Sequence, residues 1–200
     1  QIFIVRSIDS ILPNVHEIKN FKRQGTITLL STNEEVIQKI GPSTINKLSS
    51  NNIPGKVEKA FIAAEDRRFY SHQGLDFIGI GRAMIMNFRK REFKEGASTI
   101  TQQLARIVFL NQDKTFTRKL KEAALALKID RQLAKKKILV HYLNNIYLGS
   151  NAYGISDAAW VYFSKSPDQL TLEESALIAG LAPAPSYYTP LLNTNLAIKR

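Results

Sequence analysis

The 200-residue sequence contains no cysteine and no apolar run of roughly eighteen residues, the length that a membrane-spanning helix needs. The lack of cysteine excludes disulfide bonds and thiolate metal sites, but it suits a reducing cytosol and an oxidising compartment equally well. Long low-complexity tracts are absent too. Because 44% of the residues are apolar, the chain can bury one substantial core, and we expect one compact, two-lobed domain.

The order of segments predicts a mainly helical chain with a small β element near its N-terminus. We interpret residues 1–24 as an irregular stalk that follows a membrane anchor outside this sequence, and 25–200 as the main domain. The run GTITLL, residues 25–30, has the β-branched content of a short strand or hairpin arm. Near the C-terminus, Thr171 and Glu174 have the spacing of a capping box at the start of a supporting helix.

Positive charge is in excess, with 28 lysines and arginines against 17 acidic residues and a net charge of +11. Such an excess favours an anionic partner, which is compatible with nucleic acid, an anionic membrane or a phosphorylated substrate. The cations gather at Arg89–Lys94 and from Lys114 to Lys137. For Lys135 to Lys137 at the end of the second cluster, a solvated helix face is the better interpretation.

A first candidate for chemistry is Glu65, at the flank of a helical stripe formed by Val57, Phe61, Ala64 and Arg68. At the boundary of an apolar wall, desolvation disfavours the charged carboxylate and raises its pKa. Such a carboxylate can accept a proton near neutral pH. The alternative is a surface glutamate paired with a neighbouring arginine.

The next segment, DFIGIGRAMIMNFRKREFK, joins many apolar residues to a cationic end. This pattern is typical of a helix at a membrane interface, with cations among lipid headgroups. A buried helix with a basic cap explains it equally well. The residues predicted to contact the membrane are Phe77, Ile80, Met84 and Phe88.

The segment GASTITQQLARIVFLN predicts a helix with Ser98 as its N-cap. Ser98, Gln102 and Arg106 would then form a polar stripe at i, i+4 and i+8. A hydroxyl, an amide and a guanidinium suit sugar hydroxyls or phosphate oxygens. An ordinary solvent-facing stripe would have the same pattern.

The segment RKLKEAALALKID places a second glutamate on a helix that is apolar on two sides. One face carries Leu120, Ala124 and Leu127, and the opposite face carries Leu125 and Ile129. Because Glu122 shares the second face with Arg118, we expect it to be partly enclosed and paired with that arginine. The alternative is a simple i, i+4 ion pair worth a few tenths of a kcal/mol.

Four segments in order, EDRRFYSHQGLD, GASTITQQLAR, RKLKEAALALK and ILVHYLNNIYLG, resemble the successive motifs of the peptidoglycan glycosyltransferases. These form the transglycosylase domain of class A penicillin-binding proteins, and the resemblance extends from about Leu12 to the C-terminus. It implies a mainly helical, lysozyme-like fold with a head lobe and a membrane-touching jaw lobe. It also implies a transpeptidase domain that follows in the intact protein.

The resemblance assigns roles to motif positions of this sequence. Glu65 corresponds to the general base and Glu122 to a second essential carboxylate. The substrate-binding positions are Ser98, Gln102, Gln103, Arg106, Lys114, Arg118, Lys119 and Lys121. The positions that support the first motif are Asp66, Phe69, His72, Gly74 and Asp76.

The reaction implied is polymerisation of lipid II into β-1,4-linked glycan, with inversion at the donor sugar and departure of undecaprenyl diphosphate. The expected partners are lipid II, the growing lipid-linked glycan, the outer leaflet of the cytoplasmic membrane and moenomycin-type inhibitors. The expected location is therefore the extracytoplasmic side of the bacterial inner membrane. The family also implies a divalent metal such as Mg²⁺, for which Glu122 is a candidate ligand, although the sequence shows no metal site.

The sequence departs from the family pattern at two places, and two other functions compete with synthesis. Val140 stands where the fourth motif often has an acidic residue, and Asp130 stands where the third motif closes with glutamate. A lysozyme-like hydrolase or lytic transglycosylase would use a similar glutamate, but it has no need of the cations around Glu122. A basic nucleic-acid-binding module would explain the charge, but it leaves the ordered motifs without a role.

Overall fold

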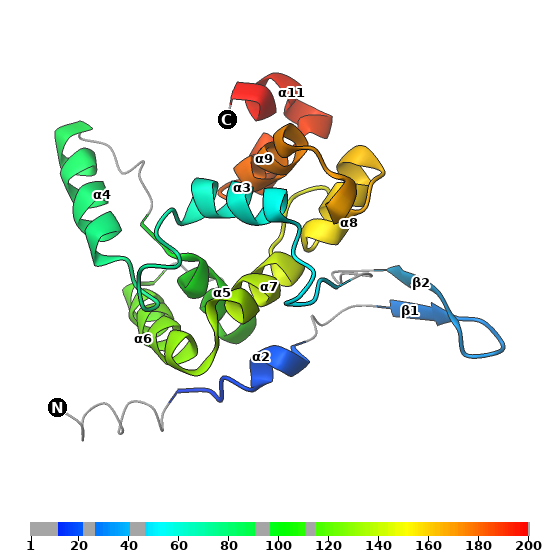
Figure 1. Cartoon of the computed structure of the whole chain (residues 1–200), viewed down its shortest axis with the longest axis horizontal. Helices are drawn as coiled ribbons and strands as arrows, with labels where there is room; N and C mark the ends of the chain where they lie inside the picture. The colour runs from blue at the N-terminus through cyan, green and yellow to red at the C-terminus, as the bar shows by residue number, and fades with distance from the viewer. Residues whose placement is uncertain (1–11, 22–26, 41–46, 91–96, 111–114, 200) are drawn as a thin grey trace.

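A computed structural model describes residues 12–21, 27–40, 47–90, 97–110 and 115–199 (Figure 1). These residues are mainly helical, as predicted from the sequence. The helices are α2 (Glu17–Asn20), α3 (Gly55–Glu65), α4 (Phe77–Lys90), α5 (Ile100–Phe109), α6 (Phe116–Gln132), α7 (Lys135–Asn145), α8 (Ile155–Phe163), α9 (Leu172–Leu181), α10 (Pro185–Tyr188) and α11 (Pro190–Lys199), with a 3-10 turn at Pro167–Gln169.

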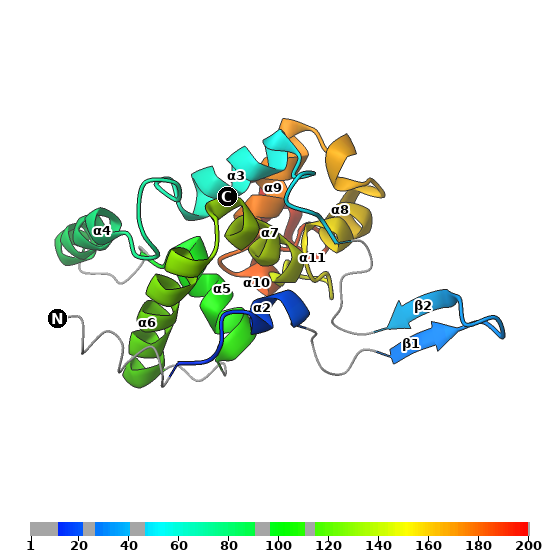
Figure 2. The ribbon, with the colours of Figure 1, turned by 60° about the horizontal axis from the view of Figure 1, so that its bottom comes forward.

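The β element is a two-stranded antiparallel hairpin of β1 (Ile27–Leu30) and β2 (Val36–Ile40). Its register shifts between Leu29 and Leu30. The hairpin extends away from the helices as a separate arm (Figures 1 and 2). The strand predicted at residues 25–30 is therefore confirmed over its described part.

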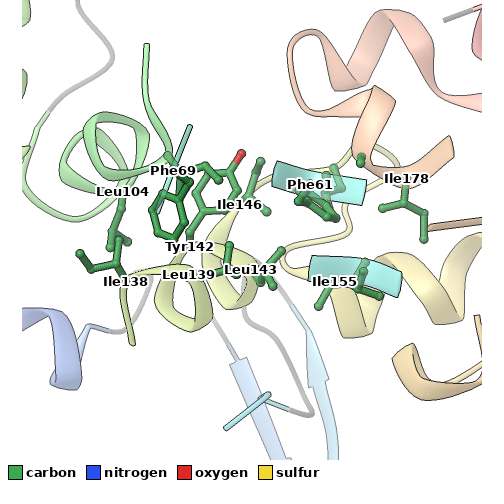
Figure 3. Packing of buried hydrophobic residues seen from close by; sticks show 14 of the residues in the cluster. Phe61, Phe69, Leu104, Ile138, Leu139, Tyr142, Leu143, Ile146, Ile155 and Ile178 are labelled. Carbon is green, nitrogen blue, oxygen red and sulfur yellow. The ribbon is translucent and has the colours of Figure 1, made fainter. Parts of the chain in front are cut away.

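The core forms around α7, which packs against α5 and lies between elements from both halves of the chain (Figure 3). Beyond its first turn this helix is buried almost all round, as a central helix must be. Tyr142 in α7 is fully buried, and the edge of its ring meets Phe61 of α3 with 6.2 Å between ring centroids. Because α3 also packs against α9, one core connects the first motif to the C-terminal helices.

Part of the expected stalk belongs to this core. Val15 and Ile18 are only 1% and 2% exposed. The Lys128 ammonium on α6 also donates a hydrogen bond to the Leu12 carbonyl over 3.1 Å. Residues 12–21 thus pack on the helical body, because two apolar side chains and a backbone acceptor find partners there. Most of the rest of 1–24 lies outside the described residues.

Helix α4 stands apart from the other helices and forms a lobe of its own (Figures 1 and 2). Phe77, Met84 and Phe88 on this helix are 72%, 68% and 87% exposed, whereas Ile80 is half-buried. Ala83 is buried. The helix therefore keeps most of its apolar surface in solvent. No helix within the described ranges has the length and apolar character required to cross a membrane.

Candidate active site

Glu65 is the last residue of α3, and the chain leaves the helix at Asp66. The helix buries Val57 and Phe61, which anchors its end against the core. The other two residues predicted on this stripe are not part of the buried face. Ala64 is exposed, and Arg68 lies beyond the end of the helix. The stripe fails there because the helix stops one residue after Ala64. Glu65 itself is half-buried at this end.

The Glu65 carboxylate has a neutral hydrogen-bond partner from another helix. The side-chain amide of Gln103 on α5 donates to Glu65 Oε2 over 2.6 Å. Gln103 is only 9% exposed, so its amide is held in place. This carboxylate is therefore oriented by a dipole rather than neutralised by that residue, and an oriented carboxylate is suited to accept a proton.

The loop after α3 is bound to the start of α5. Asp66 is buried and accepts hydrogen bonds from the Ile100 backbone N–H over 3.0 Å and from His72 Nε2 over 2.9 Å. The Thr99 hydroxyl donates to the Gly74 carbonyl over 2.6 Å. Two hydrogen bonds thus fix the loop that follows Glu65 against the start of the helix that carries Gln103, and the bond from His72 holds the loop itself.

Glycine is required at position 74. Its φ of +84° lies in the left-handed region, and a Cβ there would lie 2.5 Å from the Ala126 carbonyl oxygen of α6. The loop can approach α6 closely only without a side chain at this position. Phe69, from the same loop, is fully buried in the core. The predicted supporting positions of the first motif therefore have structural roles.

Asp76 positions the start of α4. It accepts a hydrogen bond from the Gly79 N–H over 2.9 Å and forms an ion pair with Arg68 over 2.7 Å. Burial raises the pKa of Asp76, but the bonds from Arg68 and Gly79 outweigh that effect and hold it below its usual range. The carboxylate stays charged and connects the first motif to α4.

The N-cap of α5 is Thr99, which corrects the prediction of Ser98. The Thr99 hydroxyl accepts from the Gln102 N–H, and the Gln102 side chain accepts from the Thr99 N–H, so the pair forms a capping box. That box needs a hydroxyl and a glutamine three residues apart, which only Thr99 offers here. Gln102 is consequently buried and does not continue a solvent-facing stripe with Ser98 and Arg106.

Ser98 instead faces the second carboxylate. Its hydroxyl accepts a hydrogen bond from the Lys119 ammonium over 2.7 Å, and the same ammonium binds Glu122 Oε2 over 2.7 Å. The Arg118 guanidinium binds the other oxygen, Glu122 Oε1. The Glu122 side chain is only 1% exposed, so the predicted enclosure and pairing with Arg118 are confirmed.

The other predicted buried face of α6 is only partly covered. Leu120 is 56% exposed, whereas Ala124 and Leu127 are half-buried. Leu125 and Ile129 are buried as predicted. Glu122 lies on this more deeply packed side.

Arg106 is a third cation, close enough to Lys119 for its charge to act on it. Burial, together with the charges of Arg106 and Arg118, lowers the pKa of Lys119, which shows that the cations share one small region. Three cations around one buried carboxylate leave an excess of positive charge, and such a cluster is suited to bind phosphate oxygens. Lys121 on the same helix is exposed, and Lys114 lies outside the described residues.

Helix α5 is the element shared by both carboxylates. Gln103 holds Glu65, and Arg106, three residues on and so on the same side of the helix, acts on Lys119 of the cation cluster. Within one turn, α5 thus carries both the amide that contacts Glu65 and a cation near Lys119.

Comparison with known proteins agrees with this geometry. A family model described as Transglycosylase matches residues 33–200. The chain is 45% identical over 197 residues to penicillin-binding protein 1A of Escherichia coli K12, which covers 98% of the chain and 23% of that protein. Penicillin-binding protein 1A of Neisseria cinerea and of Neisseria gonorrhoeae are 44% and 43% identical over 186 residues, 93% of the chain and 23% of each protein. The chain belongs to the transglycosylase family.

The departures from the family pattern lie in supporting positions of this transglycosylase domain. Asp130 at the end of α6 accepts a hydrogen bond from the Thr101 hydroxyl over 3.2 Å and binds Lys135 over 2.6 Å. The shorter acidic side chain therefore still joins α6 to α5 and α7. Val140 is buried, where an acidic side chain would lack water.

Two residues of the site were not found from residue patterns. Tyr142 lies in the fourth motif segment and was assigned no role, yet its hydroxyl donates to Gln103 Oε1 over 3.2 Å. Thr99 was passed over, although its three-residue spacing from Gln102 is a readable signal. For Tyr142 no local pattern exists, because its partner is 39 residues away in the sequence.

The residues around Glu122 do not fit a protein-held divalent metal. Both Glu122 oxygens are bound to cations, and the described parts of the chain contain no group of three histidine, cysteine or acidic residues arranged to hold a metal. Mg²⁺ prefers several oxygen ligands. The metal implied by the resemblance stays a prediction, and we derive no step through it.

Proposed function

We propose that this domain polymerises lipid II into β-1,4-linked glycan by inverting transfer from an undecaprenyl-diphosphate donor. The observation that carries the proposal is the pair of unlike carboxylates joined by α5, one bound by a neutral amide and the other surrounded by cations. The chain spans about a quarter of the length of the relatives it matches. A transpeptidase domain in the rest of the intact protein belongs to the same proposal.

Glu65 removes the proton from the acceptor sugar hydroxyl. Inversion at an α-linked donor requires one direct displacement without a covalent glycosyl-enzyme, so a single base is sufficient. The hydrogen bond from Gln103 orients the Glu65 carboxylate toward that task. General-base catalysis of this kind contributes roughly 10²- to 10⁴-fold.

The cation cluster stabilises the leaving diphosphate. A diphosphate departs as a stable anion, so neutralising its developing charge matters more than protonating it. Arg106, Arg118 and Lys119 provide that charge, and Glu122 holds two of them in a fixed position. A hydrolase acting on glycan strands would gain nothing from this cluster, which favours synthesis.

The exposed apolar side of α4 supports the further proposal that the domain works at the extracytoplasmic surface of the bacterial inner membrane. Phe77, Met84 and Phe88 enter the lipid interface, next to the substrate's prenyl chain. Replacing all three by serine should reduce flotation with anionic vesicles at least tenfold. The matched control is Leu192→Ser, because Leu192 is 77% exposed on α11. Equal flotation of both variants would contradict the membrane role.

Lipid II turnover by this domain, followed by gel separation of glycan products, tests the function. The unmodified domain should form polymer that moenomycin blocks, and Glu65→Gln should form none while its circular dichroism stays unchanged. Soluble sacculi are the second substrate in the same experiment. Release of muropeptides from sacculi without any polymer from lipid II would establish a hydrolase and reject the proposal.

A further inference from the structure

We propose that Tyr142 is a positioning residue, which fixes the orientation of the Gln103 amide and thereby keeps a hydrogen-bond donor on Glu65. This inference rests on the proposed function, because it specifies how the general base of that reaction is prepared.

Two hydrogen bonds in series connect the three residues. The Tyr142 hydroxyl donates to Gln103 Oε1 over 3.2 Å, and Gln103 Nε2 donates to Glu65 Oε2 over 2.6 Å. They come from three different helices, α7, α5 and α3. The bonds therefore also tie together the elements that meet at the site.

The tyrosine is rigid. It is 0% exposed, packs edge-on against Phe61, and lies among the core side chains of α7 and its neighbours (Figure 3). A buried hydroxyl needs a hydrogen-bond partner, because leaving it without one costs the full desolvation penalty. The Gln103 amide is the partner described for it.

The direction of both bonds follows from the chemistry of an amide, which has one accepting end and one donating end. If the Gln103 side chain were reversed, its Oε1 would face Glu65, and two acceptors would meet unless Glu65 were protonated. The Tyr142 hydroxyl opposes this reversal, because it donates to Oε1 in the observed orientation.

The surroundings keep Tyr142 a donor. Burial, followed by the negative charge of Glu65, raises its pKa well above its ordinary value, against the opposing charge of Arg106, and Asp66 adds to the increase. The charged groups that act on the Tyr142 hydroxyl are thus Glu65, Arg106 and Asp66. The phenol stays protonated throughout the working range of pH.

Removing the hydroxyl should allow the Gln103 amide to reverse. A reversed amide accepts from a protonated Glu65 and so favours the form that cannot act as a base. In Tyr142→Phe we therefore expect the acidic limb of the kcat–pH profile to move to higher pH. At neutral pH kcat should fall about three- to tenfold, while KM for lipid II changes less than twofold.

Tyr162→Phe is the matched control. This variant also removes a hydroxyl with hydrogen-bond partners: the Tyr162 hydroxyl donates to the Leu148 carbonyl over 2.9 Å and lies 3.2 Å from the Thr189 hydroxyl. None of its described bonds reaches Gln103 or Glu65. A purely structural effect would alter thermal stability in both variants and leave both pH profiles in place. The proposal requires that only Tyr142→Phe moves the acidic limb.

A double-mutant cycle adds a second criterion. In a Gln103→Met background, which has no amide to orient, Tyr142→Phe should produce no further shift of the acidic limb. A shift of equal size in both backgrounds, or a Tyr142→Phe profile equal to that of the unmodified domain, would overturn the proposal.

A titration without turnover separates this inference from the proposed function. With ¹³C-labelled glutamate, NMR should show a higher pKa of Glu65 in Tyr142→Phe than in the unmodified domain, whether or not lipid II is polymerised. An unchanged Glu65 titration would refute the inference alone. If Tyr142→Phe does not fold, Gln103→Met in the same titration must raise the pKa of Glu65, and an unchanged value refutes the inference as well.

Discussion

The two glutamates of the site have the same side chain and opposite surroundings. Glu65 lies half-exposed at a helix end with an amide donor from Gln103. The Glu122 side chain on α6 is almost completely buried, and each of its oxygens contacts a cation. A carboxylate held by a neutral dipole can exchange a proton, whereas one held by two cations remains charged. The surroundings of each carboxylate, rather than its chemistry, therefore make Glu65 suited to be the base and Glu122 the counter-charge.

Because their surroundings differ, the two glutamates should also differ in how much they contribute to the stability of the fold. A buried charge needs partners, and removing one member of such a group leaves the others uncompensated. Glu122 is therefore part of what holds α6 and its cations in place. Glu65 contributes less to the stability of the fold, because it lies at the edge of the core. The comparison implies that the two carboxylates should respond differently to the same substitution.

The largest expected effect is that of Glu122→Gln. It removes the charge that holds Arg118 and Lys119, so we expect loss of nearly all polymerisation together with a drop of about 1–3 kcal/mol in the free energy of unfolding. Glu65→Gln should abolish polymerisation at a cost below about 1 kcal/mol. Urea unfolding followed by circular dichroism measures both. An equal decrease in the free energy of unfolding of the two variants would contradict the different structural roles of Glu65 and Glu122.

A smaller effect is expected when one cation is removed and the carboxylate remains. Lys119→Met should lower kcat for lipid II roughly 10- to 100-fold, because one donor to the leaving diphosphate is lost. Lys136→Met is the control, since Lys136 is exposed on α7 and should be neutral within twofold. A turnover assay at saturating lipid II compares them. If both variants kept full kcat, the cluster would have no role in departure of the diphosphate.

Residue patterns predicted the parts of this site that depend on one helix. Enclosure of Glu122 followed from the apolar residues Leu125 and Ile129 on its own face, and its pairing with Arg118 from a spacing of four residues. The hairpin arm and the exposed apolar side of α4 were equally local features. The family resemblance then brought these elements together, and the comparisons confirmed the fold class and the family.

Contacts between distant segments could not be predicted in this way. The bond from Tyr142 to Gln103 depends on how α7 packs against α5, which no periodicity encodes. Residues 12–21 looked irregular, yet Val15 and Ile18 enter the core because α6 and its neighbours provide an apolar surface there. The residue at which α3 ends was not predicted either. Because the helix ends before Arg68, this side chain turns away from the apolar stripe and pairs with Asp76.

The smallest effect concerns the start of α5, the helix shared by both carboxylates. Thr99→Ala removes the cap of this helix and the bond to the Gly74 carbonyl, so the free energy of unfolding should fall by about 1–2 kcal/mol. Ser98→Ala leaves the cap intact and should change stability by less than about 0.5 kcal/mol, while it removes a contact of Lys119. Thermal and urea unfolding of the two variants test the assignment. A larger loss for Ser98→Ala would contradict this assignment and return the cap to Ser98.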